Sequence, residues 1–258
     1  MSSSAAGVSR LSHDEEVMGT VVSFRILSYR HAEEEVLRAV SDACAFLHYV
    51  DDTFSTWKPA SPLSRLRRNE VGIGDVPADI PAVLALCEEA REMSGGWFDP
   101  WAMPGGVDPT GLVKGWAIEQ SAGLLSDAGV DAAILNGGGD IAVIGSPEGS
   151  SYWPVGIQHP WRPEALACSI AVDASVATSG SYERGLHLLD PRNARPSREV
   201  ASATVTGPSL AFADALATAL AVGGHPAWEL ITHLEGFEAY MILADGTERA
   251  SDGIVVVD

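Results

Sequence analysis

The sequence predicts an α+β fold in which mixed or antiparallel sheets are flanked by helices. Helical periodicity dominates the first half of the chain, short apolar strands separated by Gly, Pro and Asp dominate the second, and a strict alternation of strand and helix is missing. With 258 residues the chain is long enough for one large domain. We therefore expect a single domain over residues 17–258, preceded by a disordered head over residues 1–16.

The first half is predicted to contain one strand and three helices. Residues 17–27 alternate loosely and are rich in Val, Phe and Ile, as strands are. Over residues 32–54 the apolar residues recur at three- and four-residue steps, which indicates an amphipathic helix. Residues 79–93 predict a second helix, with a proline in its first turn and two glycines after its end. A third helix is expected over residues 111–128.

The second half predicts short strands and a final helical segment. Apolar runs bounded by turn residues place the strands at residues 132–135, 141–144, 152–157, 167–172, 186–189, 201–206, 238–243 and 253–257. Helical periodicity returns over residues 210–222 and 227–234. The small-residue segment 178–184 is expected to form a turn after a strand, where it either connects two elements or presents hydroxyl groups to a substrate.

The balance of charges excludes several classes of protein. The sequence has 35 acidic and 16 basic side chains, a net charge of −19, and therefore lacks the positive charge that binds nucleic acid or an anionic membrane surface. Cys44, Cys87 and Cys168 show no zinc-ligand or disulfide spacing and are expected to be buried free thiols in a reducing compartment. No segment is typical of a signal peptide or a bilayer span, so we expect a cytoplasmic protein.

Common catalytic motifs are absent, and the candidate chemistry comes from Asp residues at glycine-rich breaks. Such breaks contain Asp99, Asp108, Asp140, Asp190 and Asp214. Any one of them is more often a turn or cap residue, but five breaks in one chain favour a site. The turn at residues 136–140 has two interpretations, a tight hairpin or a backbone that approaches a phosphate or a flat ring closely.

Asp214 and Thr218 are the most informative pair. Their spacing of four places both oxygens on one face of the apolar helix expected at residues 210–222. Two hard oxygen ligands of this kind can hold Mg²⁺, which takes few protein oxygens and fills its shell with water and phosphate. The alternative is that Asp214 caps the helix or hydrogen bonds to Thr218 without a metal, because an isolated carboxylate in an apolar helix needs compensation.

Read in order, these segments resemble the ApbE family, the FAD:protein FMN transferases. The matching segments are residues 18–20, 53–57 with Ser61 and Ser64, 95–100, 108–115, 136–140, 155–157 with Pro160, 177–180, 187–191 and 213–218. Each segment is weak alone, whereas the ordered series over residues 18–222 is specific. Trp57 stands where the family often has Tyr, a change that keeps a stacking ring.

The resemblance implies one ApbE-like domain of T-fold-like architecture that binds FAD and Mg²⁺, transfers FMN to a Thr or Ser hydroxyl of a target flavoprotein, and releases AMP. By position, the FAD site would be lined by Met18, Trp57, Trp97, Phe98, Asp99, Asp108, Lys114 and Leu188. The metal would be held by Asp214, Thr218 and the backbone carbonyl of Gly111. His187 would deprotonate the acceptor hydroxyl, and Asp214 would be catalytic through the metal; His187 could instead be a hydrogen-bonded strand residue.

The chain departs from the family pattern at two places. Pro109 and Thr110 stand in a segment that usually reads Asp-Leu-Gly-Gly, and Ala60 replaces a residue that is usually acidic. Two other functions share most of the same residues and stay open at this point. They are a Mg²⁺-dependent FAD pyrophosphatase that releases free FMN and AMP, and a non-catalytic FAD-binding protein.

Overall fold

An antiparallel sheet runs through the chain from its first strand to nearly its last. The computed structural model describes residues 10–180 and 189–257, and in them the largest sheet has the strand order β1-β2-β3-β4-β7-β10-β11-β12. Its strands are β1 Leu11–Val17, β2 Thr20–Tyr29, β3 Val130–Gly137, β4 Asp140–Ile144, β7 Ser175–Gly180, β10 Val200–Gly207, β11 Glu238–Leu243 and β12 Glu248–Ala250. The sheet makes β1 an edge strand and places β7 near the centre.

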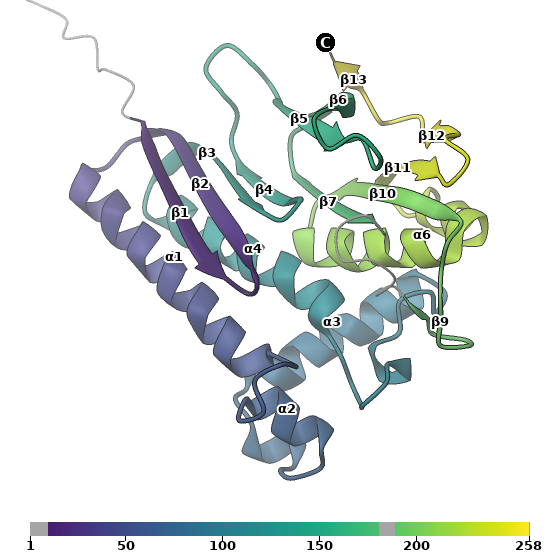
Figure 1. Cartoon of the computed structure of the whole chain (residues 1–258). Helices are drawn as coiled ribbons and strands as arrows, with labels where there is room; N and C mark the ends of the chain where they lie inside the picture. Colours follow the sequence, from purple (N-terminus) through teal and green to yellow (C-terminus); the bar gives the residue numbers. More distant parts are fainter. Residues whose placement is uncertain (1–9, 181–188, 258) are drawn as a thin grey trace, which may run out of the picture.

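Helices cover one face of this sheet, and a smaller sheet covers part of the other (Figure 1). The helices are α1 Glu33–Phe54, α2 Pro62–Arg67, α3 Asp79–Met93, α4 Thr110–Asp127 and α6 Leu210–Ile231, with short 3₁₀ turns at Ile73–Asp75 and Pro100–Ala102. The smaller sheet consists of β5 Trp153–Gln158, β6 Leu166–Val172 and β13 Val256–Val257, and a two-stranded ribbon pairs β8 Leu189–Asp190 with β9 Arg195–Pro196. Within the described ranges, no helix combines the length and apolarity that crossing a bilayer requires.

The α+β prediction is confirmed, and every recorded strand pair is antiparallel. The helices expected at residues 32–54 and 79–93 and the strand at 238–243 are found almost to the residue. The two helices expected at 210–222 and 227–234 both lie in α6, in which two helical stretches meet at a kink at Gly224, where φ is 52°.

Two expectations need correction. The disordered head was expected to reach residue 16, but residues 11–16 belong to β1, which pairs with β2 along its whole length. The alternating apolar signal is weak there because β1 is an edge strand with polar residues on both faces. Thr178–Gly180, expected in a turn, belongs to β7 instead, a strand whose small residues pack against α6.

Helices α4 and α6 approach closely because glycine stands at their contact. A β-carbon added to Gly115 would collide with the carbonyl oxygen of Leu210 and lie 2.9 Å from Cβ of Asp214. The Gly115 amide instead donates a hydrogen bond of 3.0 Å to Oδ2 of Asp214. Glu119 of α4 completes the contact by accepting hydrogen bonds from the Leu210 amide at 3.2 Å and the Ser209 hydroxyl at 3.1 Å, at the first turn of α6.

The β1–β2 hairpin closes with a strained two-residue turn. Val17 pairs with Thr20, and the two residues between them have positive φ, 53° at Met18 and 70° at Gly19. A two-residue hairpin turn of this kind requires positive φ at both central positions. Glycine accepts that conformation freely, whereas methionine does so at a cost. The strain therefore falls on Met18, a residue placed at the candidate site.

Candidate active site

A cavity of about 600 Å³ opens where the β1–β2 turn, the end of α1, the start of α4, β7 and α6 converge. Its wall includes the ten sequence-predicted site residues that the structure describes: Met18, Trp57, Trp97, Phe98, Asp99, Asp108, Gly111, Lys114, Asp214 and Thr218. The two remaining predictions, His187 and Leu188, lie outside the described residues. Residues that are up to 200 positions apart are thus brought together, as the ordered motif series requires.

An acidic centre lies where Asp214 and Lys114 line the cavity. Asp214 of α6 and Asp140 at the start of β4 are both buried. Nζ of Lys114 lies 2.7 Å from Oδ2 of Asp140 and forms an ion pair with it. The Asp140 carboxyl also faces Asp214 and the backbone of Thr178. Two buried carboxylates therefore share this centre with one identified ammonium partner in the described chain.

Burial sets the protonation of this pair. Burial, reinforced by the negative charge of Asp140, raises the pKa of Asp214 well above its usual range. Burial also raises the pKa of Asp140, although Lys114 opposes that shift. Burial therefore disfavours the ionised form of both carboxyl groups. A cation bound beside them would stabilise that form and lower both pKa values.

The remaining predicted metal ligands stand beside this centre. A β-carbon added to Gly111 would lie 3.3 Å from Oγ1 of Thr218, so the first turn of α4 and this hydroxyl are in contact. Oγ1 of Thr218 is also 3.2 Å from Oγ of Ser179 on β7. The Asp214 carboxylate, the Thr218 hydroxyl and the adjacent Gly111 backbone form a hard, oxygen-rich donor set of the kind that Mg²⁺ prefers. The residues present therefore fit a magnesium ion.

Asp99 and Asp108 line the cavity while also ordering its backbone. Oδ1 of Asp99 accepts a hydrogen bond of 2.9 Å from the Trp101 amide, and Oδ1 of Asp108 accepts one of 3.2 Å from the Thr110 amide. Each carboxylate also has an arginine partner, Asp99 with Arg91 at 3.2 Å and Asp108 with Arg67 at 3.5 Å. The turn-capping interpretation is confirmed for both residues. The same side chains also line the cavity, and their role in a binding site stays a prediction.

Aromatic side chains form the outer wall. The side chain of Trp57 is 91% exposed at the cavity rim, although the large majority of tryptophan surface is usually buried. Its loop is anchored by the hydroxyls of Ser61 and Ser64, which both donate to the Ser55 carbonyl, at 2.6 and 2.9 Å. Trp97 is covered by the guanidinium of Arg192, whose central carbon lies 3.4 Å from the ring centroid.

Some residues of the centre were not identified as site residues from the sequence. Asp140 was predicted only as one of five aspartates at glycine-rich breaks. Residues 136–140 do form a tight hairpin turn between β3 and β4, and the close approach of this turn to a ligand stays a prediction. The turn itself uses Gly138 and Gly139, with φ of 63° and 92°. A two-residue hairpin turn does not require an aspartate after it. The presence of Asp140 at that position could therefore have been read from the sequence as a sign of a role in the site. Ser179 belongs to the segment 178–184, whose hydroxyl groups were one candidate for substrate contact, whereas Arg192 carried no such signal.

The fold and the cavity define an α+β protein with an aromatic-walled cavity beside a buried acidic centre. The ApbE family matches residues 18–105 and 103–241, and the chain belongs to that family. It is 36% identical over 148 residues to an FAD:protein FMN transferase of Rhodobacter capsulatus, covering 54% of this chain and 28% of that protein. It is 33% identical over 170 residues to one of Treponema pallidum, covering 58% and 47%. The matches thus span less than half the length of these relatives.

Solved structures share the fold at lower identity. The ApbE protein of Thermotoga maritima superimposes with a TM-score of 0.83 at 19% identity, over 95% of this chain and 97% of that one. The flavin transferase ApbE of Vibrio cholerae gives a TM-score of 0.78 at 20% identity, over 95% and 97%. At such identities the likeness shows that the architecture of the ApbE family extends over nearly the whole chain.

Proposed function

We propose that the chain is a Mg²⁺-dependent FAD:protein FMN transferase that moves FMN from FAD to a Thr or Ser hydroxyl of a target flavoprotein and releases AMP. One observation carries the proposal. Asp214, which lines the aromatic-walled cavity, is buried next to a second carboxylate, Asp140, in a chain of the ApbE family. A binding protein that performs no chemistry on a phosphate would gain nothing from two destabilised carboxylates there.

The ligands proposed for Mg²⁺ are Asp214, Thr218 and the carbonyl of Gly111. When bound, the ion would neutralise negative charge on the pyrophosphate of FAD and polarise the phosphorus under attack. Asp140 would keep Lys114 close to this centre through their 2.7 Å ion pair. Phosphoryl-type transfer depends chiefly on positioning and on charge stabilisation, so these fixed groups supply what the reaction needs.

The rest of the cavity would position the two substrates. Trp57 would stack on a ring of FAD at the rim, and Met18 would contact it from the β1–β2 turn. His187 stays the predicted base that takes the proton of the acceptor hydroxyl as its oxygen attacks phosphorus and AMP leaves. A cytoplasmic target flavoprotein likewise stays a prediction from the sequence.

The test is to incubate the full chain with FAD, Mg²⁺ and a candidate flavoprotein, and to weigh the flavoprotein by mass spectrometry. We expect one covalent FMN per acceptor residue and release of AMP, with no adduct when EDTA replaces Mg²⁺. Free FMN without an adduct would support the pyrophosphatase, and intact FAD across all tested targets would support a binding protein. A target with its acceptor Thr changed to Ala is the matched control and should stay unmodified.

A further inference from the structure

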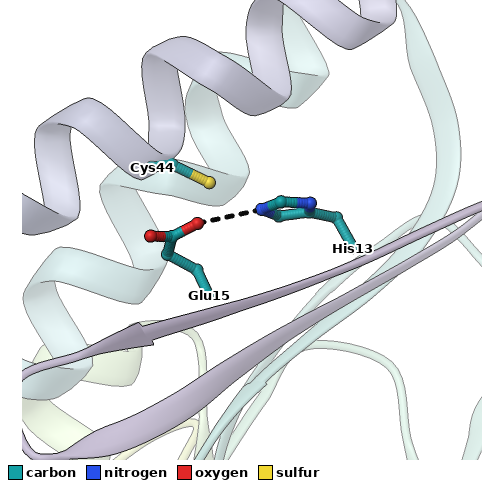
Figure 2. Close-up of side chains that lie close together, drawn as sticks. All are labelled: His13, Glu15 and Cys44. Carbon is teal, nitrogen blue, oxygen red and sulfur yellow. Dashed lines mark hydrogen bonds and ion pairs between the residues drawn. The ribbon is translucent and has the colours of Figure 1, made fainter.

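A second group of metal-binding side chains lies outside the cavity, between β1 and α1. His13 and Glu15 extend from β1, and Cys44 faces them from α1 (Figure 2). One ligand atom from each, an imidazole nitrogen, a carboxylate oxygen and the thiol sulfur, lies within 4.8 Å of the other two. None of these residues lines the cavity described above.

The geometry of the two elements aims these side chains at one point. His13 and Glu15 are two residues apart on a strand, so both point to the face that packs on α1, as their partial burial also indicates. Cys44 is buried on the facing side of α1 among apolar residues. The ring of His13 is held by Phe24, with 5.8 Å between the ring centroids.

His48 completes the group, one helical turn beyond Cys44. Its Nε2 lies 2.7 Å from Oε1 of Glu15, while Oε2 of the same carboxylate lies 3.0 Å from Nε2 of His13. His48 therefore fixes Oε1 of Glu15, and Oε2 of the same carboxylate stays directed at His13 and Cys44. Ligating carboxylates are commonly oriented by such an outer hydrogen bond.

Edge-strand protection does not account for this arrangement. An inward-pointing charge on an edge strand discourages pairing with other chains, and Glu15 alone would serve that purpose. The interface here also holds the imidazole of His13, although Leu11 and Val17 show that this face of β1 accommodates apolar residues, and a thiol lies opposite it on α1. The convergence of nitrogen, sulfur and oxygen donors at one point therefore indicates a binding site for a metal ion.

We propose that His13, Glu15 and Cys44 bind a zinc-class transition-metal ion, with His48 orienting Glu15 and water in the fourth position. In a tetrahedral zinc site the bonds are about 2.0–2.3 Å, which puts the ligand atoms roughly 3.3–3.8 Å apart. The three donors need only shifts of about an ångström to reach that geometry. The metal takes the place of the Cys44 thiol proton, which is released to solvent.

The donor set separates this site from the acidic centre at Asp214. Sulfur and imidazole donors select zinc, cobalt and related ions, whereas Mg²⁺ takes oxygen donors. Half-exposed His13, at 39%, leaves a route by which an ion can enter. The ion would tie the edge strand to α1 without touching the cavity, so its loss and the loss of transferase activity are distinguishable.

The test is to titrate Co²⁺ and then Zn²⁺ into the metal-stripped full chain in excess Mg²⁺, which occupies the oxygen site. We expect one equivalent to bind tightly, with intense tetrahedral cobalt bands and a thiolate-to-cobalt absorption, both displaced by Zn²⁺. Absence of the thiolate absorption in the wild-type chain overturns the proposal. Because this measurement uses only the wild-type chain, it does not depend on the folding of any variant.

Variants assign the ligands. Cys44→Ser should remove the thiolate absorption and weaken zinc binding more than tenfold, His13→Ala should weaken it as much, and His48→Ala should weaken it by about 10-fold, as loss of an outer partner does. Cys168→Ser, a half-buried cysteine on β6, and His31→Ala, a histidine 3.2 Å from Glu35, are matched controls that should bind as the wild type does. An unchanged cobalt spectrum in Cys44→Ser, with circular dichroism showing a folded chain, would refute the assignment.

Discussion

At the scale of single residues, the proposed function implies that the acidic centre gives up stability in return for binding a cation. Asp140 and Asp214 are buried side by side, and the pKa of Asp214 is raised by burial and by its neighbour's charge. A buried carboxylate pair without a bound cation destabilises the folded state, because desolvation and repulsion are both unfavourable. The same pair becomes favourable when a divalent ion binds. Stability measurements can therefore report on the metal site without any assay of catalysis.

Asp214→Asn tests this directly. Without metal, the variant should be more stable than the wild type by about 1–2 kcal/mol, a rise in Tm of roughly 3–6 °C, because an amide keeps the hydrogen bond from Gly115 and removes a buried charge. The Mg²⁺-dependent rise in Tm and the transferase activity should both be lost. Differential scanning calorimetry in EDTA and in Mg²⁺ checks this, with Asp173→Asn, an exposed aspartate, as control.

The pH dependence of the wild-type chain follows from the same shifts. The folded pKa of Asp214 lies above its unfolded value of about 3.8, so the folded state binds the proton more tightly. Its favourable contribution is fully present below pH 3.8 and is lost as pH rises through the folded pKa. In EDTA, this contribution should thus decline towards neutral pH, and the decline should be absent in Asp214→Asn. A pH-independent difference between the two proteins would contradict this account.

Trp57 is a second residue whose contribution can be isolated. With 91% of the side chain exposed at the cavity rim, it contributes little to folding, so Trp57→Ala should leave Tm unchanged. Loss of stacking should weaken FAD binding by about tenfold, the equivalent of about 1.4 kcal/mol, while Trp57→Phe should retain most of the affinity. Isothermal titration with FAD measures both, and Trp161→Ala, an exposed tryptophan outside the cavity, should bind normally.

At the scale of elements, the crossing of α4 and α6 builds the centre. Gly115 permits the close approach, the Asp214 carboxylate accepts its amide, and Glu119 caps the first turn of α6. The register of the two helices thereby places Gly111 against Thr218. The centre is therefore a product of helix packing, and a perturbation of the crossing should disturb both stability and metal binding.

Gly115→Ala should destabilise the chain by about 2 kcal/mol, because the added methyl meets backbone of Leu210, which cannot rotate away. Mg²⁺ affinity measured by the Tm shift should fall with it. Gly123→Ala is the matched control on the same helix, since a β-carbon there meets no atom within 4 Å. That change should stabilise the chain by about 0.5–1 kcal/mol through higher helix propensity. Equal effects of the two substitutions would exclude packing as the cause.

Elements with a strong periodic pattern were predictable, and those fixed by packing were not. The period of α1 and the buried run of β11 specify them locally. β1 reads as polar because it is an edge strand, and β7 reads as a turn because its small residues are needed for contact with α6. Asp214 was identifiable from its apolar surroundings on one helix, whereas its partner Asp140 is brought to it only by the tertiary fold.

At the scale of the whole molecule, the net charge of −19 opposes the approach of an anionic dinucleotide. Lys58, Arg67, Arg91 and Lys114 lie at or close to the cavity, but each has a carboxylate partner, and Arg192 lies over the Trp97 ring. The long-range field at the cavity entrance is therefore expected to be negative. The acidic centre then acts only after FAD has crossed a repulsive region.

The rate constant for FAD association should therefore increase with ionic strength. Raising the salt concentration from about 0.01 M to 0.15 M shortens the Debye length from roughly 30 Å to 8 Å and screens the repulsion. Stopped-flow quenching of tryptophan fluorescence can measure the rate, with neutral riboflavin as a control that should show little change. A rate that falls with salt would mean that the local arginines and lysines, and not the net charge, govern the approach.

The turn at Met18 and Gly19 links two regions of the molecule through a single pairing. Side chains of a strand alternate between faces, so a slip of β1 by one residue against β2 would turn every side chain of β1 over. His13 and Glu15 would then face solvent, and Met18 would leave its place in the turn at the cavity. The register of β1 against β2 thus fixes the positions of both the His13–Glu15 cluster and Met18. A chain mispaired at this hairpin would be defective at the cluster and at the cavity through a single error.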